Sequence, residues 1–274
     1  MKKPIILLTG ATDGIGRATA ISLARGGAVV FVHGRTRKKA EAARDEVRAS
    51  AKNDAVEAAW ADLSSLDEVR AMAADVSARA PRIDVLLNNA GVFMNERVLS
   101  RDGFEMTFAV NHLAPFLLTH LLLPKIVQSA EPRIVNVSSV AHNRGVVNLN
   151  DVNSERGFSG YGAYATSKLM NVLFSFDLAR RLVSPFVAVN ALHPGVIGTK
   201  LLREGFGMGG GSVDTGARTS VRVATDPALS HVTGKYFSDE REATASRTAH
   251  DTKLQVSLYE LSARLTSVTP IPLP

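Results

Sequence analysis

TGATDGIG, residues 9–16, follows a short apolar run and opens an amphipathic segment near the start of the chain. Gly10 allows a tight turn, Gly14 allows a pyrophosphate to approach the backbone, and Gly16 allows a helix to pack closely on a sheet. The amino end of the helix that follows favours an anion. The stretch predicts a dinucleotide-binding turn; an ordinary strand-to-helix turn, which also favours glycine, is the alternative.

Short apolar runs and longer amphipathic segments alternate along the rest of the chain. The apolar, β-branched runs predict strands at 5–8, 28–32, 56–59, 83–87, 133–137 and 186–192. Helices are predicted at about 15–26, 37–50, 65–79, 103–128, 161–183, 213–224 and 251–266. Strands that are apolar throughout are typical of a parallel sheet covered by helices on both faces. The pattern therefore predicts an α/β, doubly wound fold.

Three segments depart from this alternation. Residues 140–160 and 199–212 predict substrate-side loops, and the second is rich in glycine, which favours a mobile loop over the interior of an element. The Pro-rich end at 269–274 predicts an extended, peripheral tail.

Composition excludes several classes of protein. The 274 residues are 45% hydrophobic and 21% charged, which fits a soluble globular protein with one large domain over 1–274. The net charge of +6 is spread along the chain, so no nucleic-acid partner is expected, and the absence of cysteine excludes disulfides and thiolate metal sites. No apolar stretch approaches a membrane helix, and the first apolar run is too short for an export signal. We expect a cytoplasmic protein with no membrane partner and no metal.

The spacing of the glycines resembles the short-chain dehydrogenase/reductase family. Asn88-Asn89-Ala90-Gly91 resembles the NNAG motif of that family, and Tyr164 and Lys168 match its Tyr-x-x-x-Lys pair. Three further segments are similar to sequences of the retinol-dehydrogenase-like branch: VSSVAH at 137–142, YATSKLMNVLF at 164–174 and GKYFSDE at 234–240. The resemblance implies a single-domain Rossmann fold, with a mostly parallel, seven-stranded sheet flanked by helices, and a nicotinamide cofactor.

Residue by residue, the resemblance implies two groups of functional positions. The implied catalytic residues are Asn111, Ser139, Tyr164 and Lys168. The implied cofactor-binding residues are Gly10, Thr12, Asp13, Gly14, Ile15, Gly16, Arg35, Thr36, Asp62, Leu63, Asn89, Ala90, Gly91, Tyr164, Lys168, Pro194, Gly195, Val196 and Thr199. Taken singly, the asparagines have simpler interpretations: Asn88 and Asn89 as turn caps, and Asn111 as an ordinary helix residue beside a kink at Pro115.

The end of the second predicted strand bears on the choice of cofactor. An NAD site usually carries an acidic residue there, whereas this chain has Arg35, Thr36 and Arg37, which can donate to a 2′-phosphate. We therefore predict NADP(H), with NAD(H) as the alternative; a solvated basic helix start is the simpler interpretation. Asp13 argues against NADP(H), because related NADP-dependent enzymes often place a basic residue there, and an anion is unfavourable beside a phosphate unless it points away. The resemblance places Asp62 at the adenine amino group, and a helix cap is the alternative.

Two tyrosines precede Lys168, and helix geometry separates them. Around the helix axis, Tyr164 lies about 40° from Lys168 and Tyr161 about 20° from it. Both tyrosines are therefore on the same side of the helix as Lys168, and the angle alone does not distinguish them. Along the axis, Lys168 is about 6 Å from Tyr164 but over 10 Å from Tyr161, more than a lysine stem comfortably spans. Because a neighbouring ammonium favours the phenolate, Tyr164 is predicted as the general acid/base, and Tyr161 as part of the substrate mouth.

The family's roles for the remaining residues follow from the resemblance. It implies that Ser139 hydrogen-bonds the substrate oxygen, that Lys168 also holds the nicotinamide ribose, and that Asn111 supports a proton relay. Ser138 is the competing serine, and it is set aside because the family uses the second serine of the pair. His142 and His193 lack a triad partner or metal spacing, so packing or hydrogen-bonding roles are predicted for them.

Apolar side chains near the predicted loops indicate the class of substrate. They are Phe93, Met94, Val140, Leu201, Leu202, Phe206 and Met208. They predict a hydrophobic ketone, aldehyde or secondary alcohol, with simple loop packing as the alternative. A dinucleotide-binding sensor without catalysis is the rival function. Family members commonly pair through helices that here span about 103–128 and 161–183, so a homodimer or homotetramer is compatible with the sequence.

Overall fold

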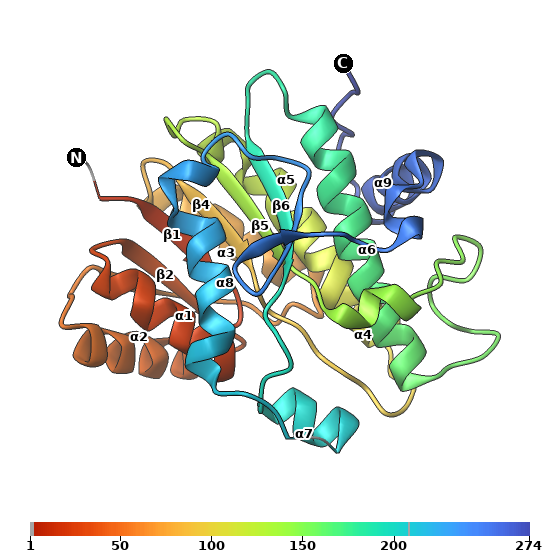
Figure 1. Ribbon diagram of the computed structural model, residues 1–274, viewed down its shortest axis with the longest axis horizontal. Coiled ribbons are helices and arrows are strands. Elements are labelled where there is room, and N and C mark those ends of the chain that lie inside the picture. The colour runs from red at the N-terminus through yellow and green to blue at the C-terminus, as the bar shows by residue number, and fades with distance from the viewer. Residues whose placement is uncertain (1–2, 208) are drawn as a thin grey trace.

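The computed structural model describes residues 3–207 and 209–274, and one sheet runs through it. The strands lie in the order β3-β2-β1-β4-β5-β6-β7-β8, and all neighbours are parallel except β7 and β8 (Figure 1). Their bounds are β1 Ile5–Leu8, β2 Val29–Gly34, β3 Val56–Trp60, β4 Val85–Asn88, β5 Arg133–Val137, β6 Ala188–His193, β7 Tyr236–Ser238 and β8 Arg241–Ala243. The doubly wound, mostly parallel α/β fold is confirmed. Three of the six strands located from the sequence begin one or two residues later than predicted.

The predicted number of strands is wrong, because the described residues form eight strands rather than seven. The additional strand is β8, which pairs antiparallel with β7 at the edge of the sheet. Asp239 and Glu240 join the two strands and both have positive φ, as a two-residue type I′ hairpin turn requires. Each strand has only three residues, too few to show the period that identifies a strand from sequence.

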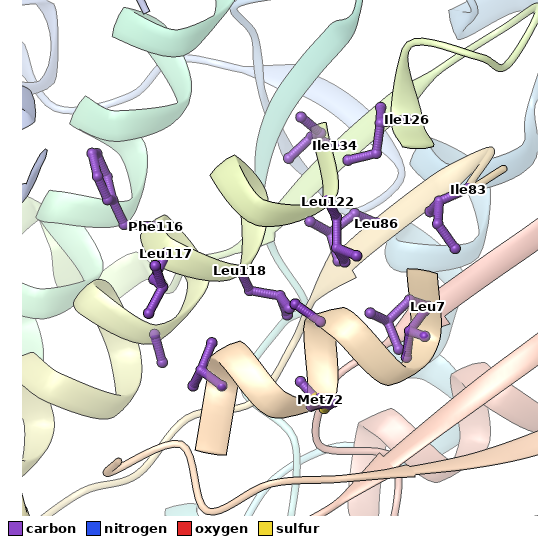
Figure 2. Packing of buried hydrophobic residues seen from close by; sticks show 14 of the residues in the cluster. Leu7, Met72, Ile83, Leu86, Phe116, Leu117, Leu118, Leu122, Ile126 and Ile134 are labelled. Carbon is purple, nitrogen blue, oxygen red and sulfur yellow. The ribbon is translucent and has the colours of Figure 1, made fainter. Parts of the chain in front are cut away.

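Helices cover both faces of the sheet. One face packs against α1 (Gly14–Arg25), α2 (Arg37–Ala51) and α8 (Val213–Thr225), of which α1 and α8 cross in front of the sheet in Figure 1. The other face packs against α3 (Leu66–Arg79), α5 (Ala114–Ile126) and α6 (Gly160–Arg181), with α9 (Thr252–Thr266) beyond them. Figure 2 shows strand residues Leu7, Leu86 and Ile134 packed beside Met72 of α3 and Leu122 of α5. Burial on both faces explains why the strands are apolar throughout.

The long helix predicted at 103–128 is interrupted. The structure has a short helix α4 (Met106–Phe108), a π-helical turn η1 (Ala109–Leu113) and then α5. Pro115 lies in the first turn of α5 and has no N–H to donate to the carbonyl four residues earlier. The hydrogen-bond register changes there, so Asn111 lies inside a π turn, a geometry often found at functional sites.

We expected no segment long and apolar enough to form a membrane helix, and on those two criteria the expectation is wrong. Among the described residues, the segment Met106–Ile126 is long and apolar enough to cross a membrane, and 72% of its apolar window is buried inside the molecule. Its buried members Phe116, Leu117 and Leu118 face other elements of the core (Figure 2). The segment therefore has the burial expected of a core helix.

The irregular segments contain more structure than predicted. A helix α7 (Lys200–Phe206) occupies the glycine-rich segment, with the Thr199 hydroxyl at its amino end and Gly207, at φ 63°, at its carboxyl end. The segment 140–160 begins with a 3₁₀ turn η2 (Val140–Arg144). The tail at 269–274 has no regular structure, and the Arg181 guanidinium donates to the Ile271 carbonyl within it.

Candidate active site

The glycine turn joins β1 to α1 at the carboxyl edge of the sheet. Gly10 and Gly14 have φ of 67° and 53°, a region that favours glycine. A Cβ on Gly16 would overlap the Gly10 carbonyl and lie 2.6 Å from the Asn89 amide nitrogen. These three positions therefore require glycine, and the backbone at Gly10 and Gly14 is open to the approach of an anion.

His33 of β2 holds this turn in place, a role that no motif in the sequence indicates. The Gly10 backbone N–H donates to His33 Nδ1 at 3.1 Å, and His33 Nε2 lies 3.0 Å from the Ala61 carbonyl oxygen. Because Nδ1 accepts, Nε2 carries the hydrogen and donates. Burial lowers the pKa of His33 to about 4, so the ring is neutral at pH 7. His33 thus ties the glycine turn to the end of β3.

Asn89 connects the turn to the end of β4. Its side-chain amide donates to the carbonyl oxygens of Thr9 and Gly10, at 2.8 and 3.1 Å. The backbone N–H groups of Asn89 and Ala90 donate in return to the Thr9 hydroxyl, at 2.9 and 3.0 Å. A Cβ on Gly10 would lie 2.8 Å from the Ala90 Cα, so the two segments pack in direct contact. The predicted cofactor residues of β1 and β4 therefore form one surface.

Arg35 and Asp62 lie close together at the ends of β2 and β3. Arg35 is exposed, and the Thr36 hydroxyl caps α2 by accepting from the Lys39 N–H at 3.4 Å. Burial would raise the pKa of Asp62, but hydrogen bonds from Ser64 and the charge of Arg35 lower it. The Asp62 carboxylate accepts from the Ser64 N–H and hydroxyl at 3.0 and 2.8 Å.

The alternative interpretation of Asp62 as a helix cap does not describe its contacts. The N-cap of α3 is Ser65, whose hydroxyl accepts from the Glu68 N–H. Asp62 instead closes the turn before that cap, followed by Leu63, which is buried.

Asp13 is exposed at the amino end of α1. It is the N-cap of α1, and its carboxylate accepts from the Gly14 N–H at 2.7 Å. Arg17, one turn further along, lies 3.8 Å from the same oxygen. An acidic residue at the amino end of a helix is favoured by the helix dipole, so local structure accounts for its presence.

The segment after β6 closes over the glycine turn. Pro194 is half-buried, Gly195 has φ of 97°, and Val196 is exposed. A Cβ on Gly14 would lie 3.3 Å from the Thr199 methyl carbon, so the segment and the turn face one another across the carboxyl edge of the sheet.

Lys168 projects from α6 toward the end of β5. Its side chain is 3% exposed, and Nζ donates to the Val137 carbonyl at 3.0 Å. Nζ lies 5.6 Å from the centre of the Tyr164 ring. Burial lowers the pKa of Lys168 to about 8, so its ammonium is still protonated at pH 7.

Tyr164 is 8% exposed and packs beside Phe93, with ring centres 5.8 Å apart. Burial raises the pKa of Tyr164 to about 12, and a hydrogen bond with Ser139 opposes that rise. Tyr161, by contrast, is 44% exposed. The two tyrosines therefore occupy different environments, one buried beside Ser139 and one at the surface.

The two serines of the Ser-Ser pair are also distinct. The Ser138 hydroxyl is buried and donates to the Lys168 backbone carbonyl at 2.7 Å, so its role is to hold α6 against β5. The Ser139 hydroxyl accepts from the Ala141 N–H at 3.2 Å and meets Tyr164. Of the two serines, Ser139 is the one that forms a hydrogen bond with the Tyr164 hydroxyl.

Asn111 in the π turn points toward the same region. Its amide donates to the Ser167 hydroxyl and the Val92 carbonyl, both at 3.0 Å, and its oxygen accepts from the Val92 N–H at 2.8 Å. A Cβ on Gly91 would lie 3.3 Å from Lys168 Nζ and 3.5 Å from Asn111 Oδ1. Gly91 therefore lies between the lysine and the asparagine, so the structure brings all four predicted catalytic residues to one edge of the sheet.

A parallel sheet with a glycine turn after its first strand, together with a buried tyrosine and lysine, defines a dinucleotide-binding oxidoreductase class. The chain belongs to the short chain dehydrogenase family, whose model matches residues 4–206, and within it to the retinol-dehydrogenase-like branch. Retinol dehydrogenase 12 of Bos taurus is 39% identical over 273 residues, covering 96% of this chain and 86% of the relative. Retinol dehydrogenase 13 of Homo sapiens is 40% identical over 277 residues, covering 95% and 83%.

Solved structures share the fold. A putative uncharacterized protein from Mycobacterium Paratuberculosis superposes with a TM-score of 0.82 at 34% identity, covering 98% of this chain and 95% of that one. A putative short chain dehydrogenase from Escherichia coli CFT073, complexed with NADPH, gives a TM-score of 0.73 at 25% identity, covering 88% and 98%. The predicted family and fold class are confirmed, and the chain is an oxidoreductase of the type that acts on alcohol or carbonyl groups.

Proposed function

We propose that this chain is one catalytic domain that transfers a hydride between NADP(H) and a hydrophobic ketone, aldehyde or secondary alcohol. The observation that carries the proposal is the grouping around Tyr164: a buried phenol hydrogen-bonded to Ser139, with the Lys168 ammonium 5.6 Å from its ring. A surface pair of no function would have no reason to be desolvated in this way.

Contacts at the carboxyl edge fit a dinucleotide. The turn allows a pyrophosphate to approach the backbone at Gly10 and Gly14, which carry no side chain, and the α1 dipole favours its charge. Thr199 and Gly195 bound the opposite side, where the nicotinamide would lie, and Ile15 packs under that segment against Gly216. Thr12 lies against Gly34 and completes the turn.

Arg35 supports NADP(H) over NAD(H). It is exposed at the end of β2, where a 2′-phosphate would lie, and no acidic residue replaces it there. The negative charge of Asp13 is offset by the Arg17 guanidinium, 3.8 Å from its carboxylate, which reduces its repulsion of a phosphate. The Escherichia coli relative of this fold that is complexed with NADPH is consistent with this preference.

The chain's own residues supply the proton chemistry. When bound, the reduced nicotinamide supplies a hydride to the carbonyl carbon. The Tyr164 hydroxyl gives its proton to the carbonyl oxygen, and Ser139 donates a hydrogen bond to the same oxygen. In the reverse direction, the Lys168 ammonium stabilises the phenolate that accepts the alcohol proton. Asn111 holds Ser167 and the backbone of Val92, so it orders the wall beside Lys168.

Apolar surface around these groups supports a hydrophobic substrate. Val140 and Val196 are 49% and 48% exposed, and Tyr161 is also exposed. Phe93 and Leu201 pack directly against the cluster of Tyr164. The predicted lining residue Met208 lies outside the described residues. Retinol dehydrogenases among the relatives act on a hydrophobic alcohol by name, and we extend only that chemical class to this chain.

The test measures oxidation of NADPH and of NADH against a panel of aliphatic and aromatic aldehydes and ketones. Turnover with NADPH and an apolar carbonyl is the expected result. Tight binding of NADPH without turnover of any carbonyl or alcohol would favour the rival function, a non-catalytic dinucleotide sensor.

Assembly and location stay predictions. Most α6 side chains are buried within the chain and α9 packs along α6, so a dimer through α6 would have to use the few residues that remain exposed (Figure 1). Light scattering would decide between a monomer and the predicted homodimer or homotetramer. The cytoplasmic location is likewise a prediction.

A further inference from the structure

His142 lies three residues after Ser139, in the 3₁₀ turn η2, and is 1% exposed. Its backbone N–H donates to the Ser139 carbonyl oxygen at 3.0 Å, and its ring Nδ1 lies 2.7 Å from the same oxygen. Because a carbonyl oxygen only accepts, Nδ1 must carry a hydrogen. One residue therefore holds the Ser139 carbonyl with two donors.

The other ring nitrogen determines the protonation state. The Ser246 backbone N–H donates to His142 Nε2 at 3.0 Å, so Nε2 has no hydrogen. Both contacts are satisfied only by the neutral ring with its hydrogen on Nδ1. Burial lowers the pKa of His142, which favours that neutral ring at pH 7.

The surroundings of the turn leave this ring little freedom. The Tyr236 ring of β7 packs with its centre 4.8 Å from that of His142. At the far end of the turn, a Cβ on Gly145 would lie 2.6 Å from the Ala165 carbonyl of α6. The turn is thus held between Ser246 on one side and α6, which carries Tyr164, on the other.

The direction of the Ser139 hydroxyl depends on this turn. Ser139 is extended, with φ −157° and ψ 157°, and its hydroxyl both caps the Ala141 N–H and meets Tyr164. A rotation of the peptide after Ser139 would move the carbonyl away from His142 and displace the Ala141 N–H, the backbone donor that holds the Ser139 hydroxyl.

We propose that His142 is a positioning residue, whose Nδ1–H donor on the Ser139 carbonyl holds the Ser139 hydroxyl toward Tyr164 and the substrate oxygen. The inference rests on the proposed function, and it adds a residue that does not itself touch substrate or cofactor. The competing explanation is a purely structural tie between η2 and the segment at Ser246, made through Nε2.

A matched pair of variants separates the two ring contacts. In His142→Asn the amide nitrogen lies near the position of Nδ1 and can still donate to the Ser139 carbonyl, whereas the contact with Ser246 is lost. In His142→Gln the amide lies near the position of Nε2, so the contact with Ser246 can persist and the donor to Ser139 is lost. Thermal unfolding of both variants measures the structural tie independently of catalysis.

The kinetic experiment uses the full chain, NADPH and a carbonyl compound that the parent reduces. Positioning predicts a kcat within about threefold of the parent for His142→Asn and at least tenfold lower for His142→Gln, with KM for NADPH within about twofold in both. Equal kcat losses in the two variants, or a smaller loss in His142→Gln, would overturn the inference. If the parent turns over no carbonyl or alcohol, the proposed function itself fails and the positioning role fails with it.

A second measurement does not depend on turnover. Long-range ¹H–¹⁵N NMR of histidine-labelled protein at pH 7 reports which ring nitrogen carries hydrogen, and His142→Asn assigns the signal. A neutral ring with hydrogen on Nδ1 is expected. An imidazolium, or hydrogen on Nε2, would contradict the donor to Ser139 and overturn the inference whatever the kinetics.

Discussion

Lys168 should reduce the stability of the fold that contains it, because its ammonium is buried. Burial lowers the pKa of Lys168 from 10.5 to about 8, and this fall corresponds to about 3 kcal/mol at 1.4 kcal/mol per pKa unit. Replacing Lys168 by Met removes the buried charge and leaves the Val137 carbonyl bonded to the Asn171 amide, 3.3 Å away. We expect Lys168→Met to be more stable than the parent by up to about 3 kcal/mol at pH 7 and to have lost activity.

The dependence on pH has a definite sign. The pKa of Lys168 is lower in the folded chain than in the unfolded chain, so the unfolded chain binds more protons between pH 8 and about 10.5. The cost of the buried ammonium is complete below pH 8 and disappears as pH rises through that window. The stability of the parent should therefore approach that of Lys168→Met toward pH 10.5.

Guanidinium unfolding without dinucleotide, at pH 7, 8, 9 and 10, measures both effects. The exposed Lys253→Met is the matched control, which should show no change in free energy of unfolding beyond about 0.5 kcal/mol. A Lys168→Met variant less stable than the parent at pH 7, or a difference that stays constant with pH, would refute the reasoning.

Three further substitutions test the cofactor and substrate sides of the site. Gly16→Ala places a methyl group 2.6 Å from the Asn89 amide, so it should cost about 2 kcal/mol or more and weaken NADPH binding at least tenfold by calorimetry; unchanged binding would contradict the account of the turn. Arg35→Ala should raise the Kd for NADPH about tenfold and leave NADH within threefold, whereas Arg37→Ala, whose guanidinium already pairs with a neighbouring carboxylate, should change both less; equal effects on the two dinucleotides would disprove the role of Arg35. Ser139→Ala should lower kcat at least tenfold in steady-state assays with little change in melting temperature, and a fully active variant would remove Ser139 from the mechanism.

The sequence predicted what depends on local spacing. The glycine turn, the helix that opens at Gly14 and the pairing of Tyr164 with Lys168 all follow from residues within one or two helical turns of each other. The strands were located because burial on both faces leaves continuous apolar runs.

What the sequence could not predict depends on contacts between distant segments or on very short elements. His33 acts on Gly10 and Ala61, which are 23 and 28 positions away, and nothing near His33 identifies those partners. The strands β7 and β8 are too short to show a period. The helix α7 was hidden by the surrounding glycines, although the Thr199 hydroxyl caps it and Gly207 ends it in the usual way.

Substitution of the two tyrosines offers the cleanest comparison of a site residue with a neighbour of the same type. Tyr164 is buried beside Ser139 and Lys168, whereas Tyr161 lies three residues earlier at the surface. Each can lose its hydroxyl by replacement with Phe at almost constant volume.

The most direct test is therefore kcat of Tyr164→Phe and Tyr161→Phe with NADPH and one carbonyl compound that the parent reduces, together with the Kd for NADPH. We expect Tyr164→Phe to lose at least a hundredfold in kcat with NADPH binding retained, and Tyr161→Phe to keep most of the activity. Equal losses in the two variants, or an active Tyr164→Phe, would contradict the assignment of Tyr164 as the acid and base.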